Sequence, residues 1–305
     1  MLRDLLNLVL RPLDLGVRSN VGLVLKGSID RVRQAAHRFK FMPIYGIEII
    51  GYERPLNASC EFLVTLHDVR FARLFVRYLT NVDSLHSLKK LRDVQVTYVD
   101  KGQVIKLDFG ALPGLERVTL EWFHGAESIF NSTKLRSLSL MYYPSLSSEP
   151  FGRFVNLTYL RLTACGLTEV EALKRSHSLR WLALLKLNKL ENFAGLSGHA
   201  AIKFLWIEGC SSLRTLEWVA DMDSLETLRI LDCGKVTGID VIRSLPRLRH
   251  LHIHGSTEIA MRDPTFLRDM PNLESVVVKG LPASEIQYWR SHSKKYDLLR
   301  ADLAE

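Results

Sequence analysis

Long apolar runs are missing from this sequence of 305 residues. No stretch reaches the length of about 18 apolar residues that a transmembrane helix needs. The start, MLRDLLNLVLRPLDL, is apolar in part, but Asp4 and Arg11 interrupt it and no small-residue cleavage site follows. We therefore expect a cytoplasmic protein without a membrane segment, and unconventional export remains an open alternative.

Cysteine is also scarce, with four residues in the whole chain. So few cysteines do not make a disulfide framework in a chain of this length. Cys165, Cys210 and Cys233 occupy the same position of a repeat described below. We expect them to line the interior as small hydrophobic residues with free thiols.

Motifs for catalysis, cofactors and metals are lacking as well. No glycine-rich phosphate loop, metalloprotease helix or nucleophile elbow occurs. Cys60 and His67 open and end one expected strand about 23 Å long, which separates a nucleophile from its base. His250, His252 and His254 alternate along one strand, but no Cys or acid is spaced to complete a four-ligand zinc site. We predict a protein that is not an enzyme and holds no cofactor or metal.

Acidic residues are too few to balance the basic ones, and the formal net charge is +8. Residues 1–90 hold fourteen Lys and Arg against eight Asp and Glu, a net of +6, so the remainder carries +2. A local excess of basic residues favours an acidic partner. Binding of nucleic acid or another polyanion through the N-terminal third is therefore an alternative function, but the nearly balanced remainder makes nucleic acid an unlikely partner there.

What the sequence does contain is one phrase, apolar-x-x-apolar-x-apolar, repeated nine times at intervals of 20 to 25 residues. The phrases begin at Leu91, Leu115, Leu135, Leu157, Leu179, Ile202, Leu225, Leu248 and Leu273. Short alternation of this kind predicts a β-strand. A fixed period of about 20 residues predicts stacked units that bury their apolar faces against one another.

The phrase, followed by a second apolar set in each repeat, resembles the leucine-rich repeats of the short class that includes the bacterial internalins. The resemblance covers roughly residues 88–282 and implies an α/β solenoid, a horseshoe with a parallel sheet on its concave face. The chain departs from the family at the ladder position, where Asn is usual, so the loop backbone needs other hydrogen-bond partners. That position holds Val99, Phe123, Tyr143, Cys165, Leu187, Cys210, Cys233, Ser256 and Leu281.

The first 87 residues change their periodicity and predict a separate α/β capping module. VGLVL, YGIEIIGY, CEFLVTL and VQVTYV are expected strands, ERPLN is an expected turn, and Ser28 and Asp68 are expected to cap two helices. The resulting order, β-α-β-β-α-β, is that of the ferredoxin-like sandwich. Degenerate repeats are the alternative, because IYGIEI has the spacing of the phrase. On the second expected helix Arg70, Arg73 and Arg77 share one face, which is either solvated or docks an acidic partner.

The last predicted region follows the repeats. We expect Ser284 to cap a helix that carries Tyr288 and Trp289 and covers the open end of the last repeat. A partner-recognition peptide is the alternative for this region. The predicted domains are thus 1–87, 88–282 and 283–305.

The outward residues of the phrases predict the functional site. Side chains three and five places after each start point inward, so those two, four and six places after it face outward on one shared sheet. Aromatic and arginine side chains, which are enriched at binding hot spots, gather on the middle phrases. We predict a non-catalytic protein that binds a protein or peptide on the concave sheet through Tyr159, Arg161, Trp181, Phe204, Trp206, Glu208, Arg229, His250 and His252.

Two other interpretations are compatible with the same residues. In the first, side chains of the N-terminal module or the C-terminal tail cover these aromatic residues. In the second, the protein is a bacterial effector or an immunity protein against a toxin, which the lack of catalytic motifs permits.

Overall fold

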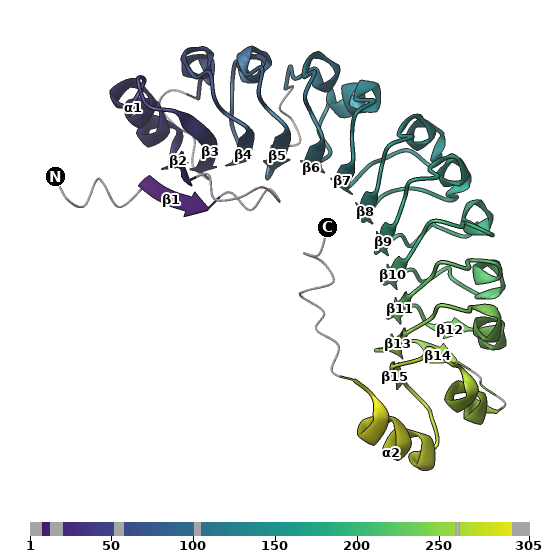
Figure 1. Ribbon diagram of the computed structural model, residues 1–305. Coiled ribbons are helices and arrows are strands. Elements are labelled where there is room, and N and C mark those ends of the chain that lie inside the picture. Colours follow the sequence, from purple (N-terminus) through teal and green to yellow (C-terminus); the bar gives the residue numbers. More distant parts are fainter. Residues whose placement is uncertain are drawn as a thin grey trace. The chain divides into compact units, whose positions relative to one another are not determined.

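The computed structural model describes residues 8–12, 21–51, 58–100, 105–259, 261 and 263–294. The chain divides into two compact units, Met1–Met141 and Tyr142–Glu305, called unit 1 and unit 2 below. In each unit the strands lie on one side and the 3₁₀ helices on the other (Figure 1). Each unit is therefore built of strand-loop-helix repeats.

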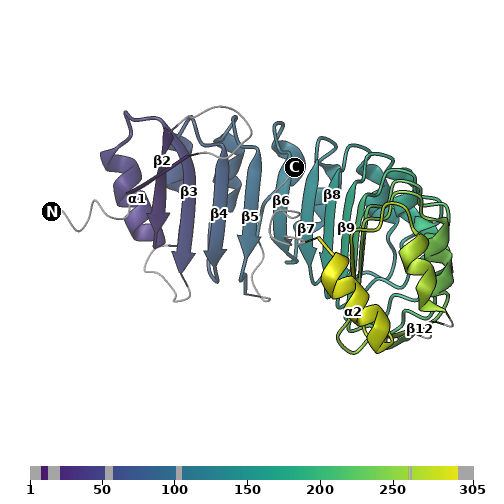
Figure 2. The same ribbon diagram turned by 60° about the horizontal axis from the view of Figure 1, so that its bottom comes forward.

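The strands of unit 1 follow one another in the sheet in the order of the sequence. β1 is antiparallel to β2, and the pairs from β2 to β7 are parallel (Figure 2). The strands are β1 (Leu8–Pro12), β2 (Val21–Gly27), β3 (Ile44–Gly51), β4 (Phe71–Val76), β5 (Asp93–Thr97), β6 (Arg117–Glu121) and β7 (Ser137–Met141). The helices are α1 (Ile29–Arg38), η2 (Glu61–Thr65), η3 (Val82–Ser87), η4 (Phe109–Ala111) and η5 (Ala126–Asn131).

Unit 2 continues the pattern with a parallel sheet in the order β8-β9-β10-β11-β13-β15 and a small pair, β12-β14. The strands are β8 (Tyr159–Thr163), β9 (Trp181–Leu185), β10 (Phe204–Glu208), β11 (Thr227–Leu231), β12 (Lys235–Val236), β13 (His250–His254), β14 (Glu258–Ile259) and β15 (Ser275–Val278). The helices are η6 (Glu149–Arg153), η7 (Glu171–Arg175), η8 (Ala194–Leu196), η9 (Glu217–Val219), η10 (Ile239–Ser244), η11 (Pro264–Asp269) and α2 (Ala283–His292).

The inward residues of the phrases make the core, as the alternation predicts. Neighbouring strands pair in register, so equivalent residues form rows across the sheet. One inward row of unit 2 is completely buried and consists of Leu160, Leu182, Leu205, Leu228 and Leu251. Since successive strand residues point to opposite faces, the residues between them form equally regular rows on the outward side.

A residue with left-handed backbone follows the strand in repeats of both units. Glycine takes this position at Gly209 and Gly255, but Lys186 (φ 57°) and Asp232 (φ 52°) adopt the same conformation with side chains. The Lys186 N–H donates to the carbonyl of Glu208 at 2.6 Å, which ties the turn to the next strand. Left-handed backbone is unfavourable for residues other than glycine. These turns therefore carry strain that glycine would relieve.

The loops find hydrogen-bond partners without the usual Asn ladder. The Cys233 N–H donates to Thr257 Oγ1 at 3.0 Å, and the Ser256 N–H donates to Asp232 Oδ1 at 2.7 Å. Thr257 is buried and Ser256 is exposed, so the prediction of Ser256 at the ladder position is wrong by one residue. The turn after β13 is one residue longer than the spacing suggested, because Gly255 and Ser256 both belong to it.

The prediction of a ferredoxin-like module is wrong. Ser28 does cap α1, since its Oγ accepts from the Arg31 N–H at 3.4 Å, and the expected strands at β2, β3 and β5 are present. However, CEFLVTL forms η2, and the expected second helix is strand β4. Burial in β4 alternates residue by residue, which is the period of a strand. The degenerate-repeat alternative is correct, because β2 to β5 pair consecutively and in parallel.

The arginine face predicted on that helix does not form. Arg73 lies on strand β4 with its guanidinium 5.3 Å from the Phe71 ring centroid, and Arg70 precedes the strand and lies 5.0 Å from the Tyr45 ring. Asp68 caps no helix and instead forms an ion pair with Lys90. The predicted turn ERPLN lies outside the described residues.

Helix α2 packs against β15 at the end of the sheet. Its N-cap is Pro282, so the predicted cap at Ser284 is wrong and that serine lies in the first turn. Glu285, almost fully buried, accepts from Arg268 through both carboxylate oxygens at 2.6 and 3.0 Å. After the helix, Ser293 Oγ accepts from the N–H of Val276 at 3.4 Å, and the Lys294 N–H donates to the carbonyl of Glu274 at 2.9 Å.

The division into domains at 1–87, 88–282 and 283–305 stays a prediction. Residues 295–305, the end of the predicted tail, are outside the part of the chain that the structure describes. The alternative in which this tail covers the aromatic residues therefore also concerns undescribed residues.

Candidate binding surface

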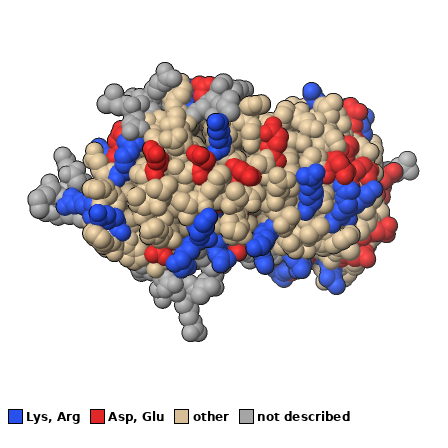
Figure 3. Space-filling view, turned by 90° about the horizontal axis from the view of Figure 1, so that it is seen from above, with Lys and Arg blue, Asp and Glu red and all other residues tan. Residues whose placement is uncertain are grey.

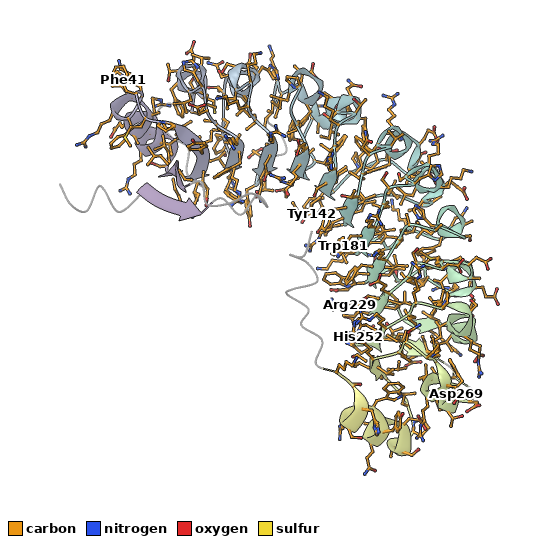
Figure 4. All side chains as sticks on the ribbon, viewed as in Figure 1. Phe41, Tyr142, Trp181, Arg229, His252 and Asp269 are labelled. Atoms are coloured by element: carbon orange, nitrogen blue, oxygen red, sulfur yellow. The ribbon has the colours of Figure 1, made fainter. Side chains whose placement is uncertain are left out.

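The predicted site residues all lie in unit 2, on the outward side of β8, β9, β10, β11 and β13. We call the outward side chains of these strands the sheet face. Trp181, Arg229 and His252 project from the strands on one side, whereas Asp269, at the end of η11, lies on the other (Figure 4). Because the strands pair in register, the sheet face consists of three rows that run across the strands.

The first row holds a continuous stack of three aromatic rings. The ring centroids of Tyr159 and Trp181 are 4.2 Å apart with planes 10° from parallel. Those of Trp181 and Phe204 are 5.0 Å apart with planes 5° from parallel. These distances match the spacing of about 4.8 Å between strands, so each ring stands on its edge above its own strand. Trp181 and Phe204 are each only 7% exposed.

The second row places two guanidinium groups against one indole. The Cζ of Arg229 lies 4.4 Å from the Trp206 ring centroid, and the Cζ of Arg161 lies 6.0 Å from it. Ala183 occupies the row between Arg161 and Trp206. Its methyl group is small enough for Arg161 to reach across β9 to the indole. The row is therefore a cation-π cluster centred on Trp206.

The third row alternates polar and aliphatic side chains. Leu185 and Leu231 are buried on either side of the half-buried Glu208. Leu185 and Ala183 also pack with the aromatic stack in one cluster of buried residues. Ala183, Leu185 and Leu231 face outward as the alternation predicts, but they are not among the predicted site residues, because that set follows aromatic, charged and histidine side chains.

Burial favours the neutral form of two histidines at the end of the sheet face, His250 and His252. Burial, helped by the positive charge of Arg229, lowers the pKa of His252 to about 4. His252 is 7% exposed, and its Nε2 lies 3.1 Å from the Oγ of Ser275. Burial, followed by the charge of Arg249, also lowers the pKa of His250. Among the described residues no group of three or more potential ligands is arranged to hold a metal ion.

Two indole N–H groups on the sheet face are buried without an acceptor among the described residues. They belong to Trp181 and Trp206. A buried donor left without a partner costs about 1–3 kcal/mol. The face therefore has more hydrogen-bond donors than its own acceptors satisfy.

The cysteine thiols are interior groups. Burial raises the pKa of Cys60 and Cys210 to about 12 and that of Cys165 and Cys233 to about 11. The Sγ atoms of Cys210 and Cys233 lie 3.4 and 3.1 Å from the carbonyls of Leu184 and Leu231, respectively. All four are free thiols, as predicted for the cysteines of the repeats. A protonated thiol is a poor nucleophile, so none is suited to covalent catalysis.

The face seen in Figure 3 has mixed charge, because basic and acidic side chains are interspersed on it. In the part of the chain that the structure describes, no helix has the length and apolarity to cross a membrane.

Comparison with known proteins finds similarity in structure. No protein-family model matches the sequence, and no curated protein matches it. An internalin from Listeria monocytogenes is similar in fold, with a TM-score of 0.59 and 16% identity over 85% of this chain and 80% of that one. A second internalin of that species has a TM-score of 0.35 and 17% identity over 76% and 80% of the two chains.

A plant protein is a further structural neighbour. The leucine-rich-repeat ectodomain of an Arabidopsis thaliana membrane receptor kinase, in complex with Casparian strip integrity factor 2, has a TM-score of 0.43 and 14% identity. The match covers 84% of this chain and 40% of that one. The similarity to the first internalin is close enough to identify the fold, and the two weaker similarities support no further conclusion.

Proposed function

We propose that this chain, which has the leucine-rich-repeat fold, is a non-catalytic binding protein that holds a protein partner on the sheet face of unit 2. The observation that carries the proposal is the aromatic stack of Tyr159, Trp181 and Phe204 beside the cation-π cluster at Trp206. Aromatic and arginine side chains dominate the binding energy of protein interfaces. Stacked rings on neighbouring strands are also rigid, so little conformational entropy is lost on binding.

The fold supplies the second support. Repeat proteins use the long surface that their stacked units form for binding. Fold alone does not assign a function, so the proposal depends on the side chains of the sheet face. Binding of a polyanion through unit 1 has less support, because Arg70, Arg73 and Arg77 do not share a helix face.

Affinity capture from the native cells tests the proposal. Intact protein, Trp206→Ala and Trp218→Ala are immobilised and the captured proteins compared. Trp206→Ala is expected to lose the specific partner, because it removes the indole that both arginines contact. Trp206 is also half-buried, so its replacement disturbs the core less than replacement of Trp181 would.

Trp218→Ala is the matched control. Trp218 is half-buried in the same unit and stacks on Phe193 at 5.1 Å, but it lies outside the sheet face. This variant is expected to capture the partner normally. Thermal unfolding of both variants shows that they are folded. Equal recovery of the partner by Trp206→Ala and the intact protein would contradict the proposal.

A further inference from the structure

The orientation of the aromatic stack determines which part of the rings meets a partner. The stack runs from strand to strand, so the ring faces of Tyr159, Trp181 and Phe204 lie against one another. Their edges then point away from the sheet. The edge of an aromatic ring carries partial positive charge, whereas its face is negative. A partner on the sheet face therefore meets electropositive edges.

The second row adds formal positive charge. Arg161 and Arg229 both lie against Trp206, and Glu208 is the one carboxylate in the rows of β8 to β11. The charge of this row thus favours an acidic partner.

The margin of the sheet face has the same bias. Arg180 is exposed and directly precedes Trp181 at the start of β9. The carboxylates further along this margin already have partners, because Glu226 lies 3.1 Å from Lys203 and Glu274 lies 2.8 Å from Arg249.

Nucleic acid would also supply negative charge, but the stack does not suit it. Proteins that bind single strands stack bases on open aromatic faces. Ring centroids 4.2 and 5.0 Å apart leave no space for a base between them. A polypeptide can instead place a carboxylate beside Arg161 and apolar side chains along Leu185 and Leu231.

We infer that the partner segment held on the sheet face is acidic, with a carboxylate directed at the half-buried Arg161 rather than at the buried Arg229, and with apolar side chains packed over the third row. This inference rests on the proposed function and specifies the chemistry of its partner. Complementary charge of this kind acts on specificity and association rate as well as on affinity.

Selection from a displayed library of random twelve-residue peptides tests the inference. Peptides retained by the full chain are passed over Trp206→Ala, and those that no longer bind form the Trp206-dependent pool. This pool is expected to be enriched in Asp and Glu. Synthetic members are expected to bind about tenfold more weakly when salt is raised from about 50 to about 300 mM, because the salt screens the charges.

Charge reversal provides the second measurement. Arg161→Glu is expected to lower affinity for the acidic peptides at least about tenfold, whereas Arg161→Lys is expected to keep most of it. Arg243→Glu is the matched control, since Arg243 lies 3.8 Å from the Phe266 ring centroid away from the sheet face. The control is expected to leave affinity unchanged.

The possible outcomes distinguish failure of this inference from failure of the proposed function. A Trp206-dependent pool that is neutral or basic would overturn the inference and leave the proposed function standing. A pool with no dependence on Trp206 would remove both. Displacement of bound peptides by polyuridine RNA at lower concentration than by an acidic peptide would overturn the choice of a polypeptide partner.

Discussion

In unit 1 the first outward positions of β5 and β6 hold Asp93 and Arg117, whose charged groups lie 3.3 Å apart. In unit 2 the equivalent positions of β8 and β9 hold Tyr159 and Trp181, whose ring centroids are 4.2 Å apart. The inward neighbours in both units are buried aliphatic side chains. The same backbone and core thus carry an ion pair in one unit and a ring stack in the other.

Aromatic residues also lie differently in the two units. Phe71 on β4 lies across Gly46 on β3, where an added Cβ would be 2.0 Å from the Phe71 ring. Because Gly46 has no side chain, the ring can cover the neighbouring strand. In unit 2 every position of the stack bears a ring, so the rings stand on edge and support one another. The difference shows that each row is shaped by the residues on neighbouring strands.

The largest expected loss of stability follows Trp181→Ala in unit 2, and Arg117→Ala in unit 1 is the comparison. We expect Trp181→Ala to lower the free energy of unfolding by about 3 kcal/mol, because it removes the middle ring of a buried stack. Arg117→Ala is expected to cost less than about 1 kcal/mol, since its ion pair is partly exposed to solvent. Denaturant unfolding followed by circular dichroism measures both. Equal losses of unfolding free energy would show that the ring stack and the ion pair contribute equally to stability.

An acid-induced loss of stability is the next largest effect. The pKa of His252 is lowered to about 4 in the folded state, so the unfolded state binds a proton more readily. The stability that this histidine contributes is present above its unfolded pKa of about 6.5 and is lost as the pH falls below it. Between about pH 7.5 and pH 5 the loss is expected to be about 2 kcal/mol.

Denaturant unfolding at the two pH values, followed by tryptophan fluorescence, checks this expectation. Trp181, Trp206, Trp218 and Trp289 all belong to unit 2, so the signal reports mainly on that unit. His252→Gln keeps a polar group near Ser275 and is expected to remove about 2 kcal/mol of the pH dependence. A variant with the same pH dependence as the intact protein would assign the loss to other groups, such as His199, whose pKa burial also lowers.

The smallest expected effect concerns a turn of unit 2. Lys186→Gly is expected to raise the free energy of unfolding by about 1 kcal/mol, because glycine adopts the left-handed backbone of that position with less strain. Lys186→Ala serves as the control, since it removes the charge and keeps the Cβ. Thermal unfolding distinguishes them, and equal stability of the two variants would show that the strain is negligible.

The sequence predicts the repeats well because their signal is redundant. Strand alternation and the fixed period both place the strands β5 to β11, β13 and β15, and the inward leucines of these strands form the core. The first repeats were misassigned because FARLFV fits two periods, with Ala72 and Phe75 suggesting a helix and Ala72 and Leu74 a strand. The pairing of β4 with β3 and β5 decides between them. That pairing depends on residues far apart in the sequence.

The sequence is sufficient to predict which residues belong to the candidate site, but not how their side chains are arranged. Alternation along single strands is sufficient to put Trp181 and Trp206 on the outward side. The stack, however, depends on ring rotamers that residues on adjacent strands determine. Ala183 contributes by being small, which lets Arg161 reach Trp206. A pattern of large or charged residues does not reveal such a contribution.

The contacts after helix α2 have a consequence for self-association. The last strand of a sheet presents backbone groups on which another copy can add its own strand. Here the Oγ of Ser293 accepts from the Val276 N–H, and the Lys294 N–H donates to the Glu274 carbonyl. A second molecule would have to displace both contacts before it could pair with β15. End-to-end polymerisation at this edge therefore competes with the chain's own closing segment.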